Sequence, residues 1–195
     1  MPSKEQLNEM KAFVLNLLHR RLPQYFCYHN SDHTLYVAEK AVEIGKAENC
    51  SEDELDLLYT AALWHDSGCI ISYINHEREG CKMARHYLPG FGYSESDIHL
   101  ICGMIMATKI PQSPQTKLEK VIADADLEYL GAEDVAAKAH ILFQELQHSN
   151  ATLTEEKWNS TQIKFLQQHR YFTTFCRENR EPGKQKYMEQ LMKAV

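Results

Sequence analysis

The sequence of 195 residues contains no apolar run that approaches the roughly 20 residues needed to span a membrane. Its first residues, MPSKEQLNEMK, also lack the basic and apolar regions of a signal peptide. The six cysteines are scattered, with no CxxC pair and no spacing typical of a disulfide framework. These absences argue against a membrane span and a disulfide scaffold, and they predict a cytoplasmic protein with reduced thiols.

Positive charge is also scarce. Lys and Arg number 21 against 27 Asp and Glu, which gives a formal net charge of -6. Such a chain lacks the overall attraction to phosphate backbones that drives non-specific nucleic-acid binding. We therefore expect no nucleic acid and no membrane as partner, and a small anion would need a local basic pocket. The sequence leaves a homodimer open.

Strand-length alternation of β-branched residues is nearly absent, whereas apolar residues recur every three or four positions. This is the helical period, and it predicts an all-α fold. Neither internal repeats nor a linker between domains interrupts the pattern. Because the length suits one hydrophobic core, we expect a single globular domain over residues 1–195.

Capping residues, glycines and prolines predict where the helices begin and end. Ser51 with Glu54 forms a capping box, and Ser94 and Thr154 are further cap candidates. A short helix is expected after Tyr171, and a last one after Pro182 and Gly183. The other predicted helices cover about 4–22, 32–46, 51–64, 76–88, 95–107, 117–131, 133–148 and 154–169.

The segment LWHDSG at residues 63–68 ends an apolar run with a histidine and an aspartate, two groups that are costly to bury. On an intact helix His65 and Asp66 would diverge by about 100°. At the last turn of a helix both can point into one cavity, and Gly68 permits such a bend. Taken alone, this dipeptide is more often a helix end whose histidine suits the helix dipole.

Two other segments carry histidines or carboxylates where the apolar pattern breaks. In YHNSDH, His29 and His33 share a face if the segment is helical, but only His33 is aimed inward if a loop precedes the helix. In VIADADLEYLG, Asp124 and Asp126 follow an apolar turn, where a carboxylate is unexpected without a positive partner. Imidazoles and carboxylates together suit a divalent metal, and their co-occurrence indicates such a site.

This order of a histidine, an adjacent His-Asp pair and a distant aspartate resembles the HD superfamily of metal-dependent phosphohydrolases. The stretch YHNSDHTLYVAEKA is similar to the opening helix of such domains, and HEREGCKMARHYL is similar to their following HE helix. The resemblance covers a motif-bearing core at about residues 25–131. It implies an HD-type domain that is distantly related to the cyclic-nucleotide phosphodiesterases. The helices of residues 132–195 are expected to pack on this core.

Carried over to this chain, the resemblance implies that His33, His65, Asp66 and an aspartate of DAD hold a divalent ion, whether Mn, Fe, Mg, Ni, Co or Zn. The ADL triplet favours Asp126, and Asp124 then supports a ligand or is itself the alternative ligand. On a helix these two side chains point about 200° apart, so one of them should be chosen.

The number of ions is a further expectation. Family members with two metals usually have a histidine near the end of the helix that follows the HE helix, where this chain reads MIMATK. This departure favours one ion over two, although His76 could still reach a second ion.

The predicted function is therefore the hydrolysis of a small phosphoester, with a nucleotide as the expected substrate and metal-bound water as the nucleophile. In this scheme Asp66 or Glu77 accepts a proton from water, and His29 protonates the leaving oxygen. The basic side chains nearest the motif, each either a phosphate contact or part of a solvated helix face, include Lys109, Arg78 and Lys82.

Two alternatives stay open. YHNSDH also resembles the cyclic-nucleotide phosphodiesterases, in which the first histidine donates a proton to the leaving oxygen, and His29 holds that place. The chain would then be a phosphodiesterase acting on a cyclic or dinucleotide. The non-catalytic alternative is a helical sensor that binds metal and nucleotide without turnover.

Overall fold

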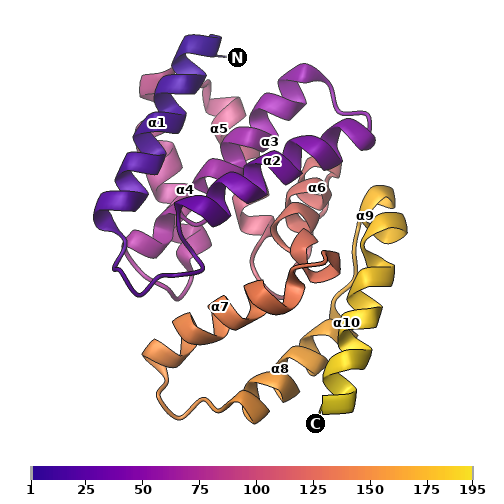
Figure 1. Ribbon diagram of the computed structural model, residues 1–195. Helices are drawn as coiled ribbons and strands as arrows, with labels where there is room; N and C mark the ends of the chain where they lie inside the picture. The colour runs from indigo at the N-terminus through magenta and orange to yellow at the C-terminus, as the bar shows by residue number, and fades with distance from the viewer. Residues whose placement is uncertain (1, 195) are drawn as a thin grey trace.

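Helices make up all the regular structure in the part of the chain that the computed structural model describes, residues 2–194, and the predicted all-α fold is confirmed (Figure 1). The α-helices are α1 (Lys4–Arg21), α2 (Ser31–Ala47), α3 (Glu52–Trp64), α4 (His76–Tyr87), α5 (Glu95–Ala107), α6 (Lys117–Asp126), α7 (Val135–Ser149), α8 (Glu155–Gln168), α9 (Thr174–Asn179) and α10 (Glu181–Ala194). Short 3-10 helices are η1 (Ser67–Ile70), η2 (Leu88–Phe91) and η3 (Glu128–Gly131). Within residues 2–194, no helix combines the length and apolar character needed to cross a bilayer.

Side-chain caps set the starts of several helices. Ser51 accepts a hydrogen bond from the backbone N–H of Glu54, whose carboxylate accepts one from the Ser51 N–H at 2.8 Å. Ser94 caps α5 with a second such pair, and the side chain of Thr154 caps α8 by accepting a hydrogen bond from the N–H of Lys157. Each such cap stabilises a helix by about 1 kcal/mol. The predicted starts of these three helices are therefore confirmed.

Two predicted boundaries at the C-terminal side are wrong. The helix expected over 117–131 ends at Asp126, because Leu127 leaves the helical backbone and η3 follows. Helix α10 begins at Glu181, so that Pro182 lies in its first turn instead of before it. Proline is tolerated there because the first N–H groups of a helix have no partner within the helix.

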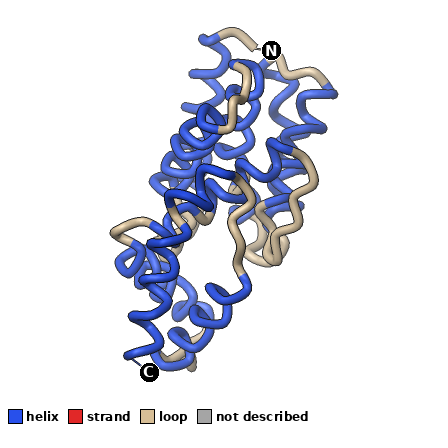
Figure 2. The backbone as a smooth tube through the Cα atoms, turned by 90° about the vertical axis from the view of Figure 1, so that its right-hand side faces the viewer, coloured by secondary structure: helices blue, strands red, loops and turns tan. Residues whose placement is uncertain are grey.

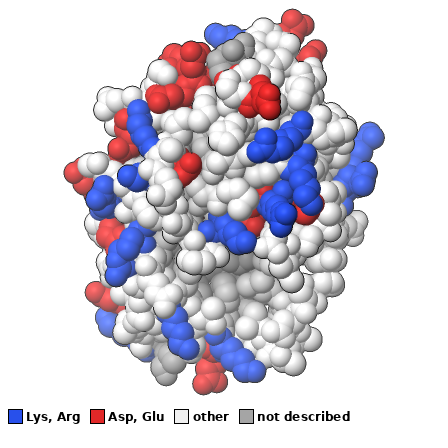
Figure 3. Space-filling model, turned by 180° about the vertical axis from the view of Figure 1, so that it is seen from behind, with Lys and Arg blue, Asp and Glu red and all other residues white. Residues whose placement is uncertain are grey.

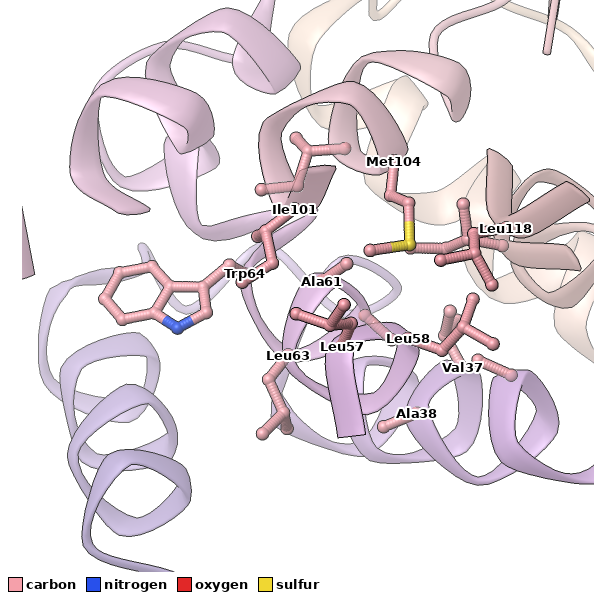
Figure 4. Close-up of a cluster of buried hydrophobic side chains, with 14 of the residues drawn as sticks. Val37, Ala38, Leu57, Leu58, Ala61, Leu63, Trp64, Ile101, Met104 and Leu118 are labelled. Atoms are coloured by element: carbon pink, nitrogen blue, oxygen red, sulfur yellow. The ribbon is translucent and has the colours of Figure 1, made fainter. Parts of the chain in front are cut away.

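The main core is centred on α3, whose side chains from Leu57 to Trp64 are nearly all buried. In Figure 4, Leu57, Leu58 and Ala61 of this helix lie in one cluster with Val37 of α2, Met104 of α5 and Leu118 of α6. Burying a side chain of this size stabilises the fold by about 1.5–3 kcal/mol. The end of α3 is thus held rigidly, which fixes the residues that follow it.

A second, smaller core joins η3 to the C-terminal helices. It contains Tyr28, Leu127, Tyr129, Leu130, Val135, Ala139, Leu166 and Tyr187. In Figures 1 and 2, α7, α8 and α10 form one end of an elongated molecule, and α1 to α5 form the other. The C-terminal helices therefore extend the molecule from the point where α6 ends.

Candidate metal centre

His33 is positioned by the start of α2. The side chain of Asn30 caps this helix by accepting hydrogen bonds from the N–H groups of Asp32 and His33 at 2.9 and 3.1 Å. The helix start aims the His33 imidazole inward, where its Nε2 lies 3.5 Å from Asp66 Oδ2 and 3.4 Å from Asp126 Oδ1. Of the two histidines of YHNSDH, His33 is therefore the one that meets the aspartates.

The His-Asp pair lies where α3 ends. Helix α3 stops at Trp64, His65 follows it, and Asp66 leaves the helical backbone before η1 begins. The Nδ1 atom of His65 lies 2.7 Å from the carbonyl oxygen of Ala62, to which it donates. Its Nε2 therefore faces Asp66 Oδ2 at 3.0 Å and Asp126 Oδ1 at 3.5 Å. Both members of the pair point to one place.

The sequence suggested that Gly68 permits a bend after the His-Asp pair, but the structure shows a different reason for glycine at this position. It does not adopt the left-handed backbone that favours glycine. A Cβ atom on Gly68 would overlap the carbonyl oxygen of His76 and crowd the backbone nitrogen of Gly80. Glycine is needed because η1 and α4 approach each other closely, and this approach brings His76 next to Asp66.

The two aspartates of ADAD diverge. Asp126 is the last residue of α6 and faces His33 and His65. Asp124 accepts hydrogen bonds from the N–H of Phe172 at 2.9 Å and from the N–H and hydroxyl of Thr173 at 2.7 and 2.6 Å. Its carboxylate holds the segment before α9, so Asp124 lies apart from the His33, His65, Asp66 and Asp126 cluster.

Buried polar atoms in this cluster lack hydrogen-bond partners. His65 is 1% exposed and Asp66 4% exposed, yet His65 Nε2 and Asp66 Oδ2, although 3.0 Å apart, do not meet in hydrogen-bond geometry and have no other hydrogen-bond partner. Buried polar groups are ordinarily hydrogen-bonded, so these atoms call for another partner. Ligand atoms of His33, His65 and Asp66 lie within 4.8 Å of one another, a spacing compatible with one shared ion about 2 Å from each. The donor set fits a divalent cation.

The electrostatics favour positive charge at this point. Burial alone would lower the pKa of His65, but Asp66 and Asp126 raise it well above its usual value. Burial alone would raise the pKa of Asp66, but His65 and His29 hold it well below its usual value. His33 and His65 likewise lower the pKa of Asp126 to about 2, against the effect of burial. Both carboxylates are therefore ionised, and their negative charge favours a cation between them and the imidazoles.

A second group of potential ligands shares Asp66. His76 Nε2 lies 3.3 Å from Asp66 Oδ1 and 3.6 Å from Glu77 Oε1. Cys69, which the sequence reasoning did not single out, completes a set with Asp66 and His76 whose ligand atoms lie within 4.8 Å. The carbonyl oxygen of Tyr73 lies 2.9 Å from His76 Nδ1 and orients the ring. The two oxygens of Asp66 thus face two different groups.

Glu145 of α7 is a site residue that the sequence reasoning missed. Only 2% exposed, it accepts hydrogen bonds from the N–H groups of Tyr28 and His29 at 2.7 and 3.0 Å and also bonds His29 Nδ1. Burial alone would lower the pKa of His29, but Asp66 and Glu145 raise it. An acid within the apolar stretch at 141–147 was a signal that could have identified it.

A cavity of about 470 Å³ opens beside the cluster. Lys109 lines it and donates a hydrogen bond to Asn75 at 2.8 Å. Arg78 and Lys82 are not among the lining residues: Arg78 is exposed, and Lys82 pairs with Glu79 at 2.7 Å. Figure 3 shows a hollow below the centre of the back face, with Lys and Arg side chains above it. The ionisable lining residues are His29, Asp66, Tyr28, Tyr73, His76, Glu77, Lys109, Asp126 and Tyr129.

Solved structures share this architecture. Bacillus subtilis YpgQ in complex with ADP is 22% identical, with a TM-score of 0.68 over 98% of this chain and 95% of that one. A predicted HD superfamily hydrolase from an uncultured Thermotogales bacterium is 23% identical, with a TM-score of 0.56 over 80% of this chain and 88% of that one. A Lactobacillus plantarum protein is 17% identical, with a TM-score of 0.68 over 100% and 98%. At these identities the likeness concerns the fold alone.

The sequence is similar to one known family. No curated protein matches the chain. Residues 30–128, more than half of the chain, match the family model of the HD domain, and they include the His33, His65, Asp66 and Asp126 cluster. The chain therefore belongs to the HD domain family.

Proposed function

We propose that this protein is a metal-dependent phosphohydrolase that acts on a small phosphoester, with nucleotides as the substrate class. Membership of the HD domain family supports a metal-dependent hydrolase. The observation that carries the proposal is the pair of unpartnered buried atoms, His65 Nε2 and Asp66 Oδ2, beside a cavity large enough for a small ligand. The ADP held by the similar YpgQ structure supports a nucleotide.

In this proposal one divalent ion is held by His33, His65, Asp66 and Asp126. When bound, such an ion supplies a Lewis acid for a phosphoryl oxygen and makes bound water more acidic. Asp66 is shared with His76, which keeps a second ion open as an alternative. Imidazole and carboxylate donors suit the first-row divalent metals, and they do not select one of them.

The remaining roles fall to side chains that line the cavity. His29 is the proton donor to the leaving oxygen, because Glu145 engages its Nδ1 and leaves Nε2 free. Glu77 or Asp66 accepts a proton from water; Glu77 Oε2 is buried without a hydrogen-bond partner. Lys109 binds a phosphate oxygen. Arg78 and Lys82 do not line the cavity, and this scheme gives them no role.

The decisive experiment combines metal analysis with a substrate panel. Protein purified without chelator should hold about one divalent ion per chain and should hydrolyse nucleotides. The variant His33→Ala should lose both properties, whereas His99→Ala, which removes an exposed histidine outside the cluster, should keep them. Protein that holds only trace metal, and that stays inactive when Mn, Fe, Co, Ni or Mg is added, would contradict the proposal.

A phosphodiesterase is the second candidate, and the held imidazole of His29 would serve it in the same way, as proton donor to the leaving oxygen. Parallel assays of monoesters and of cyclic or dinucleotide diesters separate the two enzymes. Binding of a nucleotide without turnover of any panel member would instead support a sensor.

A further inference from the structure

The cavity beside the metal-ligand cluster has two chemically different ends. The end near the cluster carries the charged and titratable groups, among them Asp66, His76, Glu77 and Lys109. Another part of the lining, called the neutral end below, comes from α7 and α8, which contribute Leu142, Leu146, Trp158, Phe165 and Leu166. None of these is charged, so a ligand that fills the cavity needs a charged end and a neutral, mostly apolar end.

The neutral end is held in place by its own contacts. The ring of Trp158 stacks on Phe143 with 6.2 Å between ring centroids and 25° between planes, while Trp158 also lines the cavity. Gln162 is 9% exposed and accepts a hydrogen bond from the hydroxyl of Tyr187 at 2.9 Å. Thr161 donates its hydroxyl to the carbonyl of Lys157 at 2.8 Å. These polar groups of the neutral end thus already have hydrogen-bond partners within the protein, and its aromatic side chains remain available to contact a ligand.

The basic groups of the cavity limit the charge of a ligand. Among the residues that line it, Lys109 is the only lysine or arginine, and it lies at the charged end. A ligand with negative charge spread along its whole length would therefore meet no cation at α7 and α8. A planar uncharged ring, by contrast, gains about 1–3 kcal/mol by stacking on an aromatic side chain.

We propose that α7 and α8 form the binding site for an uncharged aromatic ring of nucleobase size, with Trp158 as the side chain on which that ring stacks. The site selects phosphoesters that carry such a ring over sugar or alkyl phosphates. For the phosphate end this inference rests on the function proposed above. The ring-binding helices lie beyond residues 30–128, the part that matches the family model.

Helix α7 also connects the ring site to the proton donor. Leu142 and Leu146 line the neutral end, and Glu145, on the same face, holds His29. A ring seated against α7 therefore fixes the ester relative to His29. This predicts that the ring contributes to kcat as well as to KM.

Two ligands that differ by the base alone test the ring site. The full-length protein, loaded with Mn²⁺, is titrated with AMP and with ribose 5-phosphate in a calorimeter. Wild-type protein should bind AMP at least about tenfold more tightly. Trp158→Ala should reduce AMP affinity to that of ribose 5-phosphate, Trp158→Phe should retain most of the difference, and Lys164→Ala, an exposed position on α8, should change nothing.

Equal binding of AMP and ribose 5-phosphate by the wild-type protein would overturn the ring site, and this comparison needs no variant to fold. Equal weakening of both ligands in Trp158→Ala would also overturn it. Turnover distinguishes the ring site from the proposed function. Hydrolysis of both compounds with equal kcat and KM contradicts the ring site alone, whereas Trp158-dependent binding of AMP without hydrolysis contradicts the phosphohydrolase alone.

Discussion

At the scale of single residues, the carboxylate of Glu145 has the clearest task. It receives two backbone N–H groups and the imidazole of His29, although 116 positions separate the two side chains in the chain. Such a carboxylate fixes the tautomer and orientation of a histidine. In the proposed mechanism, Glu145 is thus a positioning residue that acts through His29.

Replacing Glu145 by Gln should lower kcat by about 10- to 100-fold and leave KM nearly unchanged. The loss should grow along a series of aryl phosphates as the leaving group becomes poorer, because protonation of the leaving oxygen is impaired. Glu156→Gln, at an exposed position of α8, is the matched control. A loss of equal size across the whole series would argue that Glu145 is needed for folding alone.

The two aspartates of ADAD give a second matched pair. Asp126→Asn should lower the affinity for the metal ion by more than about tenfold, because replacing a residue that only hydrogen-bonds to a ligand already lowers metal affinity by that much. Asp124→Asn should leave the metal content unchanged but should lower stability by about 1–3 kcal/mol, because it weakens charged hydrogen bonds to Thr173 and its neighbour. Metal analysis and thermal unfolding of both variants separate the two effects. Loss of the ion in Asp124→Asn would reverse the assignment.

At the scale of helices, local sequence signals predicted the first five α-helices well. Ser51 and Ser94 cap their helices through contacts with residues three positions away, and such contacts can be read from the chain. The start of α10 was not predictable in the same way. Pro182 fits both a loop before a helix and the first turn of one, so the sequence did not decide between them, and α10 packs against η3 from its first turn onward.

Glycine allows that packing. A Cβ on Gly183 would overlap the backbone of Gly131, and Gly183→Ala should therefore lower the free energy of unfolding by about 1–3 kcal/mol. Gly90→Ala is the control, since a Cβ there meets no atom within 4 Å. Denaturant unfolding measures both. Equal stability of the two variants would mean that α10 shifts away from η3 without cost.

The site was predictable in part, for a similar reason. The HD dipeptide, His33 and the DAD segment were weak signals one by one, but their co-occurrence indicated a metal site, and the structure brings His33, His65, Asp66 and Asp126 within a few ångströms. Glu145, Cys69 and the aromatic wall were missed. Glu145 and Trp158 depend on how α7 and α8 fold back toward His29, which no local pattern specifies.

At the scale of the whole molecule, acid should loosen the attachment of the C-terminal helices. His169 lies between α8 and α10, where burial and the charge of Lys184 lower its pKa from 6.5 to about 4. Since the unfolded chain binds this proton and the folded chain does not, His169 contributes its full stability above about pH 6.5 and loses it as the pH falls toward 4.

The loss amounts to about 3 kcal/mol over that interval. Urea unfolding at pH 7.0 and at pH 4.5 measures this loss. The same measurement on His169→Asn gives the contribution of carboxylates that titrate in this range, which is then subtracted. The wild-type protein should lose more stability on acidification than the variant does. Equal losses would show that His169 is protonated as readily in the folded chain as in the unfolded one.

The bond between Asp124 and the segment before α9 has a consequence for how this architecture can vary. Tyr171 donates its hydroxyl to the carbonyl oxygens of Leu127 and Glu128 at 3.2 and 3.3 Å, next to the Asp124 contact with Thr173. The segment of residues 127–171 thus begins and ends next to the C-terminus of α6, and its two ends are held together by these hydrogen bonds. Lengthening or shortening this segment changes the loop-closure entropy only slightly. Evolution or design can therefore change the cavity lining from α7 and α8 to suit another ligand, while Asp126 keeps its position at the end of α6.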